Sequence, residues 1–202
     1  MALLLLRHGT TSMNHSDPAK DRIRGWQDVP LSSEGRRVAA ILAEKAKGFP
    51  LHDLHSSDLS RAKETAEAVS KTTGLKVSLH HALRPWNLGK LAGQPTKKVL
   101  PLIKALVARP DMKAPGGESF SEFLRRLLPK VMPMLADDKL HGIVTHVRGI
   151  HTIESLIAGH GKLDKATFDR TPSVDPGGIA YADESVFRPM THESNQAPSA
   201  GS

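Results

Sequence analysis

Short apolar runs alternate with longer amphipathic segments along most of this chain, and that alternation limits its fold more than any other feature. The segments between the runs have the apolar periodicity of helices. Strands that alternate with helices favour an α/β domain with a mostly parallel central sheet. The runs with the length and composition of strands are residues 2–6 (ALLLL), 51–57 (LHDLHSS), 75–83 (LKVSLHHAL) and 141–146 (HGIVTH).

Residues that start and stop helices place the helices between these strands. Ser33 suits the N-cap of a helix over Glu34–Lys47, which Gly48 would end. Residues 177–183 and 185–189 predict a closing hairpin, and we expect one domain over residues 1–189 followed by a polar, disordered tail over 190–202. The other expected helices are 58–74, Thr96–Ala108 with an early interruption at Pro101, Phe120–Met134 with kinks or shortening at Pro129 and Pro133, and 149–161.

The composition argues against several classes of protein. The apolar run at residues 2–6 is shorter than the roughly 7–15 residues of a signal-peptide core, and no stretch approaches the about 20 apolar residues of a spanning helix. The chain has no cysteine, which excludes disulfides and suits a reducing, cytoplasmic location. The net charge of +7 suggests an anionic partner, and its spread along the chain favours a phosphorylated molecule over nucleic acid.

Polar residues follow the apolar part of two predicted strands. Arg7 and His8 come directly after the first strand, and His146 ends a later one. Ligands of α/β sheets bind beyond the carboxyl ends of the strands, so we expect His8 and His146 on one edge. A neutral imidazole can attack phosphorus to form a phosphohistidine, and arginine forks match the phosphoryl oxygens. Arg7 and Arg61, the latter in the first turn of a helix, would supply these forks.

Two further residues suit the same site. Gly9 would let the backbone approach a phosphate closely, and Asn14 would donate an amide N–H. If His146 is protonated, it adds a positive charge and a donor opposite the nucleophile. The sum is two histidines and two arginines from separate segments around one tetrahedral anion.

With these residues in place, the chain resembles a known family, the histidine phosphatase (phosphoglycerate mutase-like) superfamily, in the branch with an RHG motif. The resemblance implies a three-layer α/β/α sandwich with neither a metal nor an organic cofactor. It implies that His8 is the phosphate-accepting nucleophile, that Arg7, Arg61 and His146 form the phosphate pocket, and that Asn14 supports them. The segments that resemble the family's successive motifs, between about Leu3 and Gly161, are RHGTTSMN, RIRGWQDVPLSSEG, HSSDLSRAKETAEAV, ALRPWNLGKLAGQ, PGGESFSEFLRR and IVTH.

Carboxylates are missing from the positions where this family commonly has its general acid. Those positions hold Pro85, Ala92 and Val147 in this chain. Glu118 is the remaining candidate for the proton donor, while Asp58 is expected instead to cap its helix. General acid help is typically worth about 10²–10⁴ in rate, so we expect stronger relative activity on good leaving groups.

Other polar and aromatic residues have both a functional and a structural interpretation. Arg24 and Arg84 flank the expected pocket, as substrate contacts or as ties between loops. Trp26 and Trp86 would form a wall for an apolar substrate or pack within the fold. The remaining histidines in the strand regions offer no His-x-x-x-His pair with a nearby acid, so no metal site is predicted from His52, His55, His80 or His81.

The sequence therefore predicts a metal-independent phosphatase that hydrolyses a phosphomonoester or phosphoanhydride through His8. Its substrate is expected to be a phosphorylated small molecule, with a phosphoprotein as the alternative, and no nucleic-acid or membrane partner is expected. The rival functions are a mutase-like phosphotransferase, a relative with weak turnover, and a basic module that binds a phosphorylated partner. The substrate and the oligomeric state are left open. The loops expected to select the substrate are Asn14–Gly25, Pro85–Pro95 and Arg109–Gly117.

Overall fold

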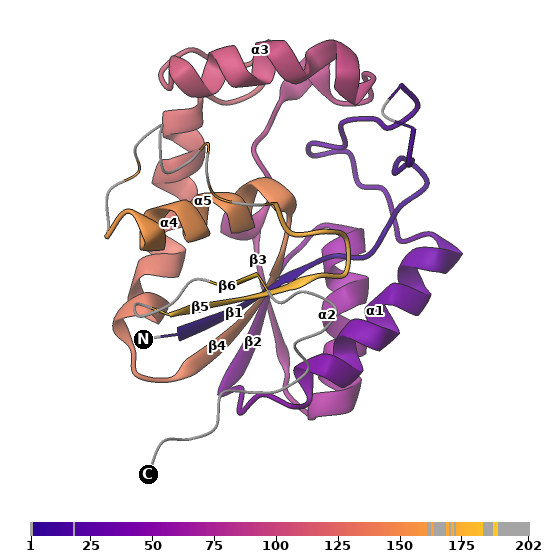
Figure 1. Ribbon diagram of the computed structural model, residues 1–202, viewed down its shortest axis with the longest axis vertical. Coiled ribbons are helices and arrows are strands. Elements are labelled where there is room, and N and C mark those ends of the chain that lie inside the picture. Colours follow the sequence, from indigo (N-terminus) through magenta and orange to yellow (C-terminus); the bar gives the residue numbers. More distant parts are fainter. Residues whose placement is uncertain are drawn as a thin grey trace.

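Within the described residues of the computed structural model, six strands form one sheet between two layers of helices (Figure 1). The spatial order of the strands is β3-β2-β4-β1-β5-β6. The strands are β1 (Ala2–Arg7), β2 (Asp53–Ser57), β3 (Val77–His80), β4 (Leu140–Thr145), β5 (Ile179–Asp183) and β6 (Arg188–Pro189). The residues that the structure describes are 2–17, 19–160, 163, 169, 171, 173–183 and 188–189.

The pairing of the strands confirms the predicted mostly parallel sheet. β1 pairs in parallel with β4, and β2 pairs in parallel with both β3 and β4. β5 runs antiparallel to β1 and to β6, as the expected closing hairpin requires. Residues 184–187 between these two strands, and the expected tail at 190–202, lie outside the described residues.

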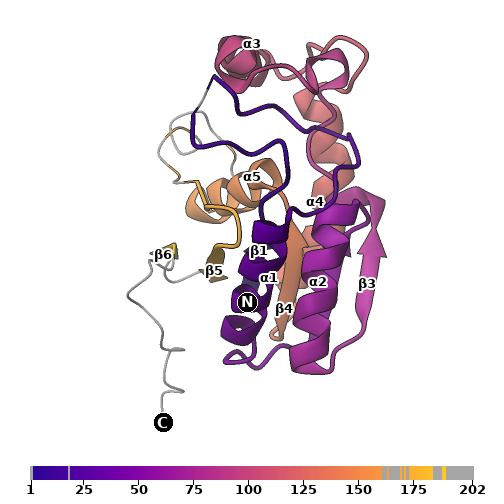
Figure 2. The same cartoon turned by 90° about the vertical axis from the view of Figure 1, so that its right-hand side faces the viewer.

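Helices cover both faces of the sheet (Figures 1 and 2). α1 and α2 lie on one face, α4 and α5 lie on the other, and α3 lies past the ends of the strands. No helix in the described part of the chain is long and apolar enough to cross a membrane. The helices are α1 (Ser33–Ala46), α2 (Ser60–Thr73), α3 (Thr96–Ala108), α4 (Phe120–Ala136) and α5 (Val147–Ala158), with short 3₁₀ turns at His81–Leu83 and Gly89–Leu91.

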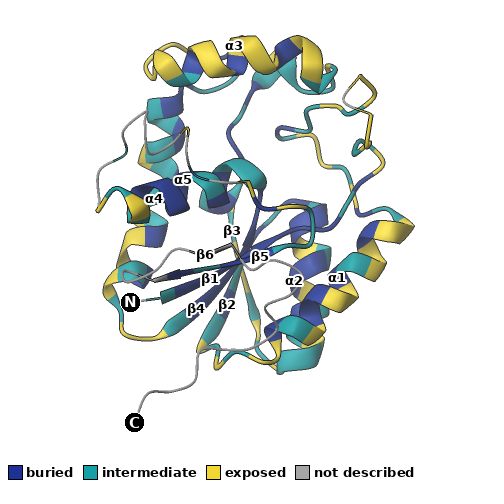
Figure 3. Ribbon diagram, in the orientation of Figure 1, coloured by how far each residue is buried: buried dark blue, intermediate teal, exposed yellow. Residues whose placement is uncertain are grey.

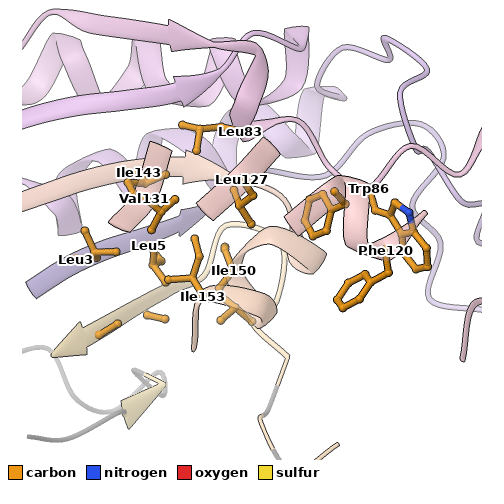
Figure 4. Close-up of a cluster of buried hydrophobic side chains, with 14 of the residues drawn as sticks. Leu3, Leu5, Leu83, Trp86, Phe120, Leu127, Val131, Ile143, Ile150 and Ile153 are labelled. Atoms are coloured by element: carbon orange, nitrogen blue, oxygen red, sulfur yellow. The ribbon is translucent and has the colours of Figure 1, made fainter. Parts of the chain in front are cut away.

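The apolar run of β1 is buried on both faces of the sheet, which explains why it does not alternate with polar residues. Leu3 and Leu5 belong to the cluster under α4 and α5, shown with its partners in Figure 4. Leu4 and Leu6 belong to the cluster under α1 and α2. Figure 3 shows the result, with buried strands in the middle and exposed faces on the outer sides of the helices. β1 thus lies inside the sheet with both of its faces packed, and the residues that follow it extend from a buried strand.

The helix boundaries differ from the sequence expectations in two respects. α1 starts at Ser33, and its N-cap is Ser32, whose Oγ accepts a hydrogen bond from the backbone N–H of Gly35 at 3.0 Å. The expectation that Ser33 is the cap is therefore wrong by one residue. Both serines have the required hydroxyl, and only the direction in which the chain enters the helix distinguishes them.

The prediction that prolines interrupt or shorten two helices is also wrong. α3 continues through Pro101, and α4 continues through Pro129 and Pro133 to Ala136. A proline inside a helix costs about 3 kcal/mol or more. Tertiary burial offsets this cost, since the residues of α4 that face the sheet recur every three or four positions and are Phe120, Phe123, Leu127, Val131 and Met134.

Candidate active site

His8 lies immediately beyond the end of β1, and only 3% of its surface is exposed. Its Nδ1 is 2.6 Å from the carbonyl oxygen of Gly9. Because a carbonyl only accepts hydrogen bonds, Nδ1 carries the proton, and Nε2 has a free lone pair. Burial, together with the charges of Arg61 and Arg7, lowers the pKa of His8 well below 6.5. The imidazole is therefore neutral at pH 7, and the lone pair of its Nε2 is available to act as a nucleophile.

His146 lies opposite His8, with the two ring centroids 5.0 Å apart. Arg7 and Thr145 are partners in the parallel ladder, so the histidines that follow them emerge side by side at one edge of the sheet. Burial and the charge of Arg61 lower the pKa of His146 well below 6.5, so His146 acts as a neutral donor in the free protein. The two histidines thus share the edge that the sequence predicted.

The hydroxyl of Ser57, at the end of β2, is the hydrogen-bond partner of His146 Nε2. Its Oγ accepts from the backbone N–H of Leu59 at 3.4 Å and lies 2.9 Å from His146 Nε2. We infer that the hydroxyl donates to Nε2, which leaves the proton on Nδ1. This Nδ1 has no hydrogen-bond partner among the described residues. Sequence reasoning missed Ser57, although it too stands at the carboxyl end of a strand.

Arg7 and Arg61 bring two buried guanidinium groups to the same edge. Arg7 donates to the carbonyl oxygen of Val174 at 2.5 Å. Arg61 donates to the carbonyl oxygens of Gln27 at 2.8 Å and Gly25 at 2.9 Å. Burial, followed by the charge of a neighbouring arginine, lowers the pKa of each to about 10, so both remain charged at pH 7. The Nε atom of each arginine has no hydrogen-bond partner within the described residues.

The start of α2, which carries Arg61, is capped by Asp28 from a distant loop. The Asp28 carboxylate accepts from the Ser60 backbone N–H at 2.7 Å and from the Ser60 hydroxyl at 2.9 Å. The expectation that Asp58 caps this helix is wrong, because the N-cap residue is Leu59 and the Asp58 carboxylate is paired elsewhere. A cap from a remote segment has no signal in the local sequence.

Gly9 and Asn14 both shape the loop that follows β1. A Cβ atom on Gly9 would lie 2.3 Å from the carbonyl oxygen of Gly35, so the start of α1 requires a glycine there. The Asn14 carbonyl oxygen accepts from the backbone N–H of Thr11 at 2.9 Å and from its hydroxyl at 3.1 Å. Each residue therefore has a structural task in addition to the phosphate contact expected of it.

Arg24 and Arg84, the two flanking arginines, differ in their availability to a substrate. Arg24 forms an ion pair with Asp21 at 3.2 Å, and its charge acts on both imidazoles of the site. Arg84 is held by both carboxylate oxygens of Asp58 at 2.7 Å. Its guanidinium also lies 5.1 Å from the ring centroid of Trp26. Arg84 is thus engaged in holding the loop together, whereas Arg24 extends the positive charge of the site.

Glu118, the candidate proton donor, is engaged in contacts with its own neighbourhood. Its Oε1 accepts from the Asn87 backbone N–H at 2.8 Å and from Arg126 at 2.7 Å. Arg126 also donates to the carbonyl oxygens of Ala82 at 2.8 Å and Pro85 at 3.1 Å. These contacts hold the Glu118 carboxylate within its own loop, and its role as the proton donor stays a prediction. Arg126, which the sequence analysis missed, organises this loop.

The two tryptophans pack within the loops around the site. The Nε1 of Trp26 donates to the carbonyl oxygen of Pro85 at 2.7 Å, and its ring meets His81 edge to face. Trp86 is buried, and its Nε1 donates to the carbonyl oxygen of Glu118 at 3.0 Å. Both contacts correspond to the packing interpretation.

The three loops expected to select a substrate are joined to one another. The backbone N–H of Ile23 donates to Gln94 at 3.0 Å, and the N–H of Gly93 donates back to Ile23 at 2.7 Å. The N–H of Lys90 donates to Pro115 at 2.8 Å, which joins the second loop to the third. Backbone hydrogen bonds therefore join these three loops, which are far apart in the sequence, into one connected unit.

Comparison with known proteins agrees with this geometry. The sequence model of the histidine phosphatase superfamily (branch 1) matches residues 3–180. The chain therefore belongs to the histidine phosphatase superfamily.

Curated relatives match part of the chain. The probable phosphoglycerate mutase GpmB of Yersinia enterocolitica is 30% identical over 132 residues, and the protein of the same name from Salmonella choleraesuis is 32% identical over 132 residues. Each match covers 63% of this chain and 60% of the relative, so the chain matches less than two thirds of these relatives' length.

Solved structures match nearly all of the fold. A mycobacterial glucosyl-3-phosphoglycerate phosphatase in complex with VO3 has a TM-score of 0.73 at 25% identity, with 89% of this chain and 91% of that chain covered. The protein TTHB049 from Thermus thermophilus has a TM-score of 0.68 at 30% identity, with 91% of this chain and 94% of that chain covered. The predicted three-layer fold of this superfamily is thus confirmed.

Proposed function

We propose that this chain is a metal-independent phosphatase that hydrolyses a phosphomonoester or phosphoanhydride through a phosphohistidine on Nε2 of His8. One observation carries the proposal. Arg7 and Arg61 are buried, each has an unpaired Nε, and neither forms an ion pair within the described part of the chain. Buried guanidinium groups are costly, and a phosphoryl group would supply acceptors and negative charge in addition to the nearby carboxylates of Asp175, Asp21 and Asp28.

The reaction would proceed in two displacements. In the first, Nε2 of His8 attacks phosphorus, and the bond between phosphorus and the leaving oxygen breaks as the N–P bond forms. Arg7, Arg61 and the Nδ1–H of His146 donate to the phosphoryl oxygens and stabilise the transferring group. In the second, water attacks phosphorus, the N–P bond breaks, and inorganic phosphate leaves with the His8 lone pair restored.

The substrate we propose is a phosphorylated small molecule, and we place the enzyme in the cytoplasm, which suits a chain without cysteine. The positive charge of Arg24 beside the two histidines favours a substrate with a second negative group. The names of the relatives make 3-phosphoglycerate and glucosyl-3-phosphoglycerate the first compounds to test. The relatives named as mutases also support a phosphotransferase as the second candidate.

Trapping of the intermediate tests the proposal. The wild-type chain, mixed with a ³²P-labelled aryl phosphate and quenched in base, is expected to carry acid-labile label. His8→Ala is expected to lose the label and at least about 10³ in kcat. His52→Ala, at an exposed histidine outside the loops expected to select the substrate, is the control and is expected to keep both.

Each rival function has its own outcome in this experiment. Turnover or labelling that survives in His8→Ala would overturn the phosphohistidine mechanism. Release of phosphate from 3-phosphoglycerate without an isomerised product is expected, and an isomerised product in its place would identify a mutase. Binding of phosphorylated compounds with neither label nor phosphate release would identify a binding module.

A further inference from the structure

A second polar cluster lies at the end of the sheet opposite the candidate active site. Asp53 is the first residue of β2, and His141, near the start of β4, is its direct partner in the parallel ladder. His55 follows Asp53 by two positions, so it projects from the same face of the sheet. The side chains of His141 and His55 are 7% and 12% exposed, and that of Asp53 is 36% exposed. The parallel register thus gathers three metal-ligating groups at one partly covered place.

The atoms of this cluster converge. His141 Nδ1 lies 2.8 Å from one oxygen of Asp53, and His55 Nε2 lies 3.1 Å from the other. One ligand atom from each of the three residues lies within 4.8 Å of the other two. The Nε2 of His55 makes no aligned hydrogen bond with any described residue despite its short distance to Asp53. Two imidazoles and one carboxylate thus present three ligand atoms at one place.

One imidazole also has a partner on its other nitrogen. His55 Nδ1 lies 3.0 Å from Nε2 of His80, at the end of β3. Histidines that bind a metal through one nitrogen usually donate the other N–H to an acceptor, which fixes the tautomer and the ring. His80 stands where such an acceptor is needed. The Nε2 of His141 makes no hydrogen bond with a described residue, and a carboxylate oxygen of Asp137 lies 3.6 Å from it.

We propose that Asp53, His55 and His141 form a Zn²⁺ site that ties the amino-terminal ends of β2 and β4 together. Two imidazoles and one carboxylate, completed by a water molecule, are a set of ligands that suits tetrahedral Zn²⁺. Mg²⁺ and Ca²⁺ prefer sets of oxygen ligands, which this cluster does not offer. The site lies at the other end of the strands from His8, so its role is structural and separate from the phosphatase chemistry.

Metal analysis after equilibrium dialysis tests the site. Full-length protein is first freed of metal with a chelator and then dialysed against Zn²⁺. The wild-type chain is expected to hold one Zn²⁺ at the cluster and to unfold at a higher temperature with Zn²⁺ than without it. Asp53→Asn, His55→Gln and His141→Gln are each expected to weaken binding by at least about tenfold and to lose the thermal shift.

Two further variants locate the bound metal. His52→Gln removes an exposed histidine whose ring centroid lies 6.2 Å from that of His141, and it is expected to bind as the wild type does. His8→Ala removes the histidine of the other site and is also expected to keep the cluster's Zn²⁺. Absence of Zn²⁺ binding, or binding that His8→Ala abolishes and the three cluster variants retain, would overturn the proposal. Neither binding nor the thermal shift depends on whether the chain is a phosphatase.

Discussion

The residues around His8 and His146 are rich in positive charge, which Arg7, Arg24 and Arg61 supply. Pro85 stands where relatives of this kind commonly have a glutamate, and its carbonyl oxygen accepts from Trp26 and Arg126. Asp58 and Glu118 form ion pairs with Arg84 and Arg126. Under the proposed mechanism, attack on phosphorus is well supported, and the departing oxygen receives little help from these two paired carboxylates.

This imbalance predicts a strong dependence on the leaving group. An aryl phosphate expels a weakly basic oxygen, whereas an alkyl phosphate needs a proton as its oxygen departs. We expect kcat/KM for the aryl phosphate to exceed that for a size-matched alkyl phosphate by about 10²–10⁴. Steady-state assays of phosphate release over such a series measure the ratio, and equal values would show that an acid acts from a place we have not recognised.

Glu154 is a second residue whose environment has a measurable consequence. It lies on α5 with 0% of its surface exposed, and its carboxylate oxygens have no hydrogen-bond partner among the described residues. Burial raises its pKa from 4.5 to about 8. The folded chain therefore keeps Glu154 protonated at pH 7, whereas the unfolded chain ionises it.

This shift predicts a loss of stability as the pH rises. Below pH 4.5, Glu154 is mostly protonated in both the folded and the unfolded chain, so it does not reduce the free energy of unfolding. It falls as the pH rises from 4.5 to about 8, by up to roughly 5 kcal/mol. Glu154→Gln is expected to remove this part of the pH dependence in urea unfolding at pH 5 and pH 9. Glu67→Gln, on the exposed side of α2, is the control and should show the same pH dependence as the wild type. A wild-type pH dependence in Glu154→Gln would show that Glu154 does not cause the loss of stability.

At the scale of elements, close contacts between loops and helix starts fix the positions of the residues of the candidate site. The loop after β1 contacts the start of α1 so closely that a Cβ on Gly35 would lie 1.9 Å from the Thr10 carbonyl oxygen. The start of α2 is held by Asp28, and the loop next to Asp28 accepts both hydrogen bonds of Arg61. The position of Arg61 therefore depends on a contact between a loop and a helix.

Loss of the Asp28 cap predicts an effect on both stability and binding. Asp28→Ala leaves two hydrogen bonds of Ser60 unmade, which is expected to cost about 1–2 kcal/mol of stability. It is expected to raise KM more than it lowers kcat, because Arg61 binds the phosphoryl group in the ground state as well as in the transition state. Thermal melting and steady-state kinetics measure the two effects. Glu67→Ala, which removes an exposed pair with Lys63, should change neither, and an unchanged KM in Asp28→Ala would refute the positioning role.

At the scale of the whole molecule, the chain has a net charge of +7. Part of this charge comes from Arg7, Arg24 and Arg61, which act on His8 and His146. Long-range attraction of an anionic substrate is screened by salt. We expect kcat/KM to fall on the order of tenfold between low and high concentrations of a chloride salt, while kcat changes little. Initial rates at limiting substrate measure this dependence. A kcat/KM that does not respond to salt would show that the charge of the molecule does not guide the substrate.

Much of the fold could be predicted from local patterns. The apolar run before Arg7, the periodicity of the helices and the glycines at their ends set the order of strands and helices, because these signals depend on neighbours in the sequence. The same patterns placed His8 and His146 after parallel strands, and the parallel ladder brings them together. The expected interruption at Pro101 and the expected shortening at Pro129 and Pro133 were wrong, since burial of a helix face outweighs a local propensity.

The partners of the polar side chains were decided by the tertiary structure alone. Asp28 rather than Asp58 holds the start of α2, and Glu118 accepts from Arg126. The convergence of Asp53 and His141 has no trace in sequence spacing, because it depends on the register of two strands 88 positions apart. By itself, the sequence determined the elements and the residue types that end them. Only the folded chain decided which side chains meet, since those contacts join residues that no local pattern connects.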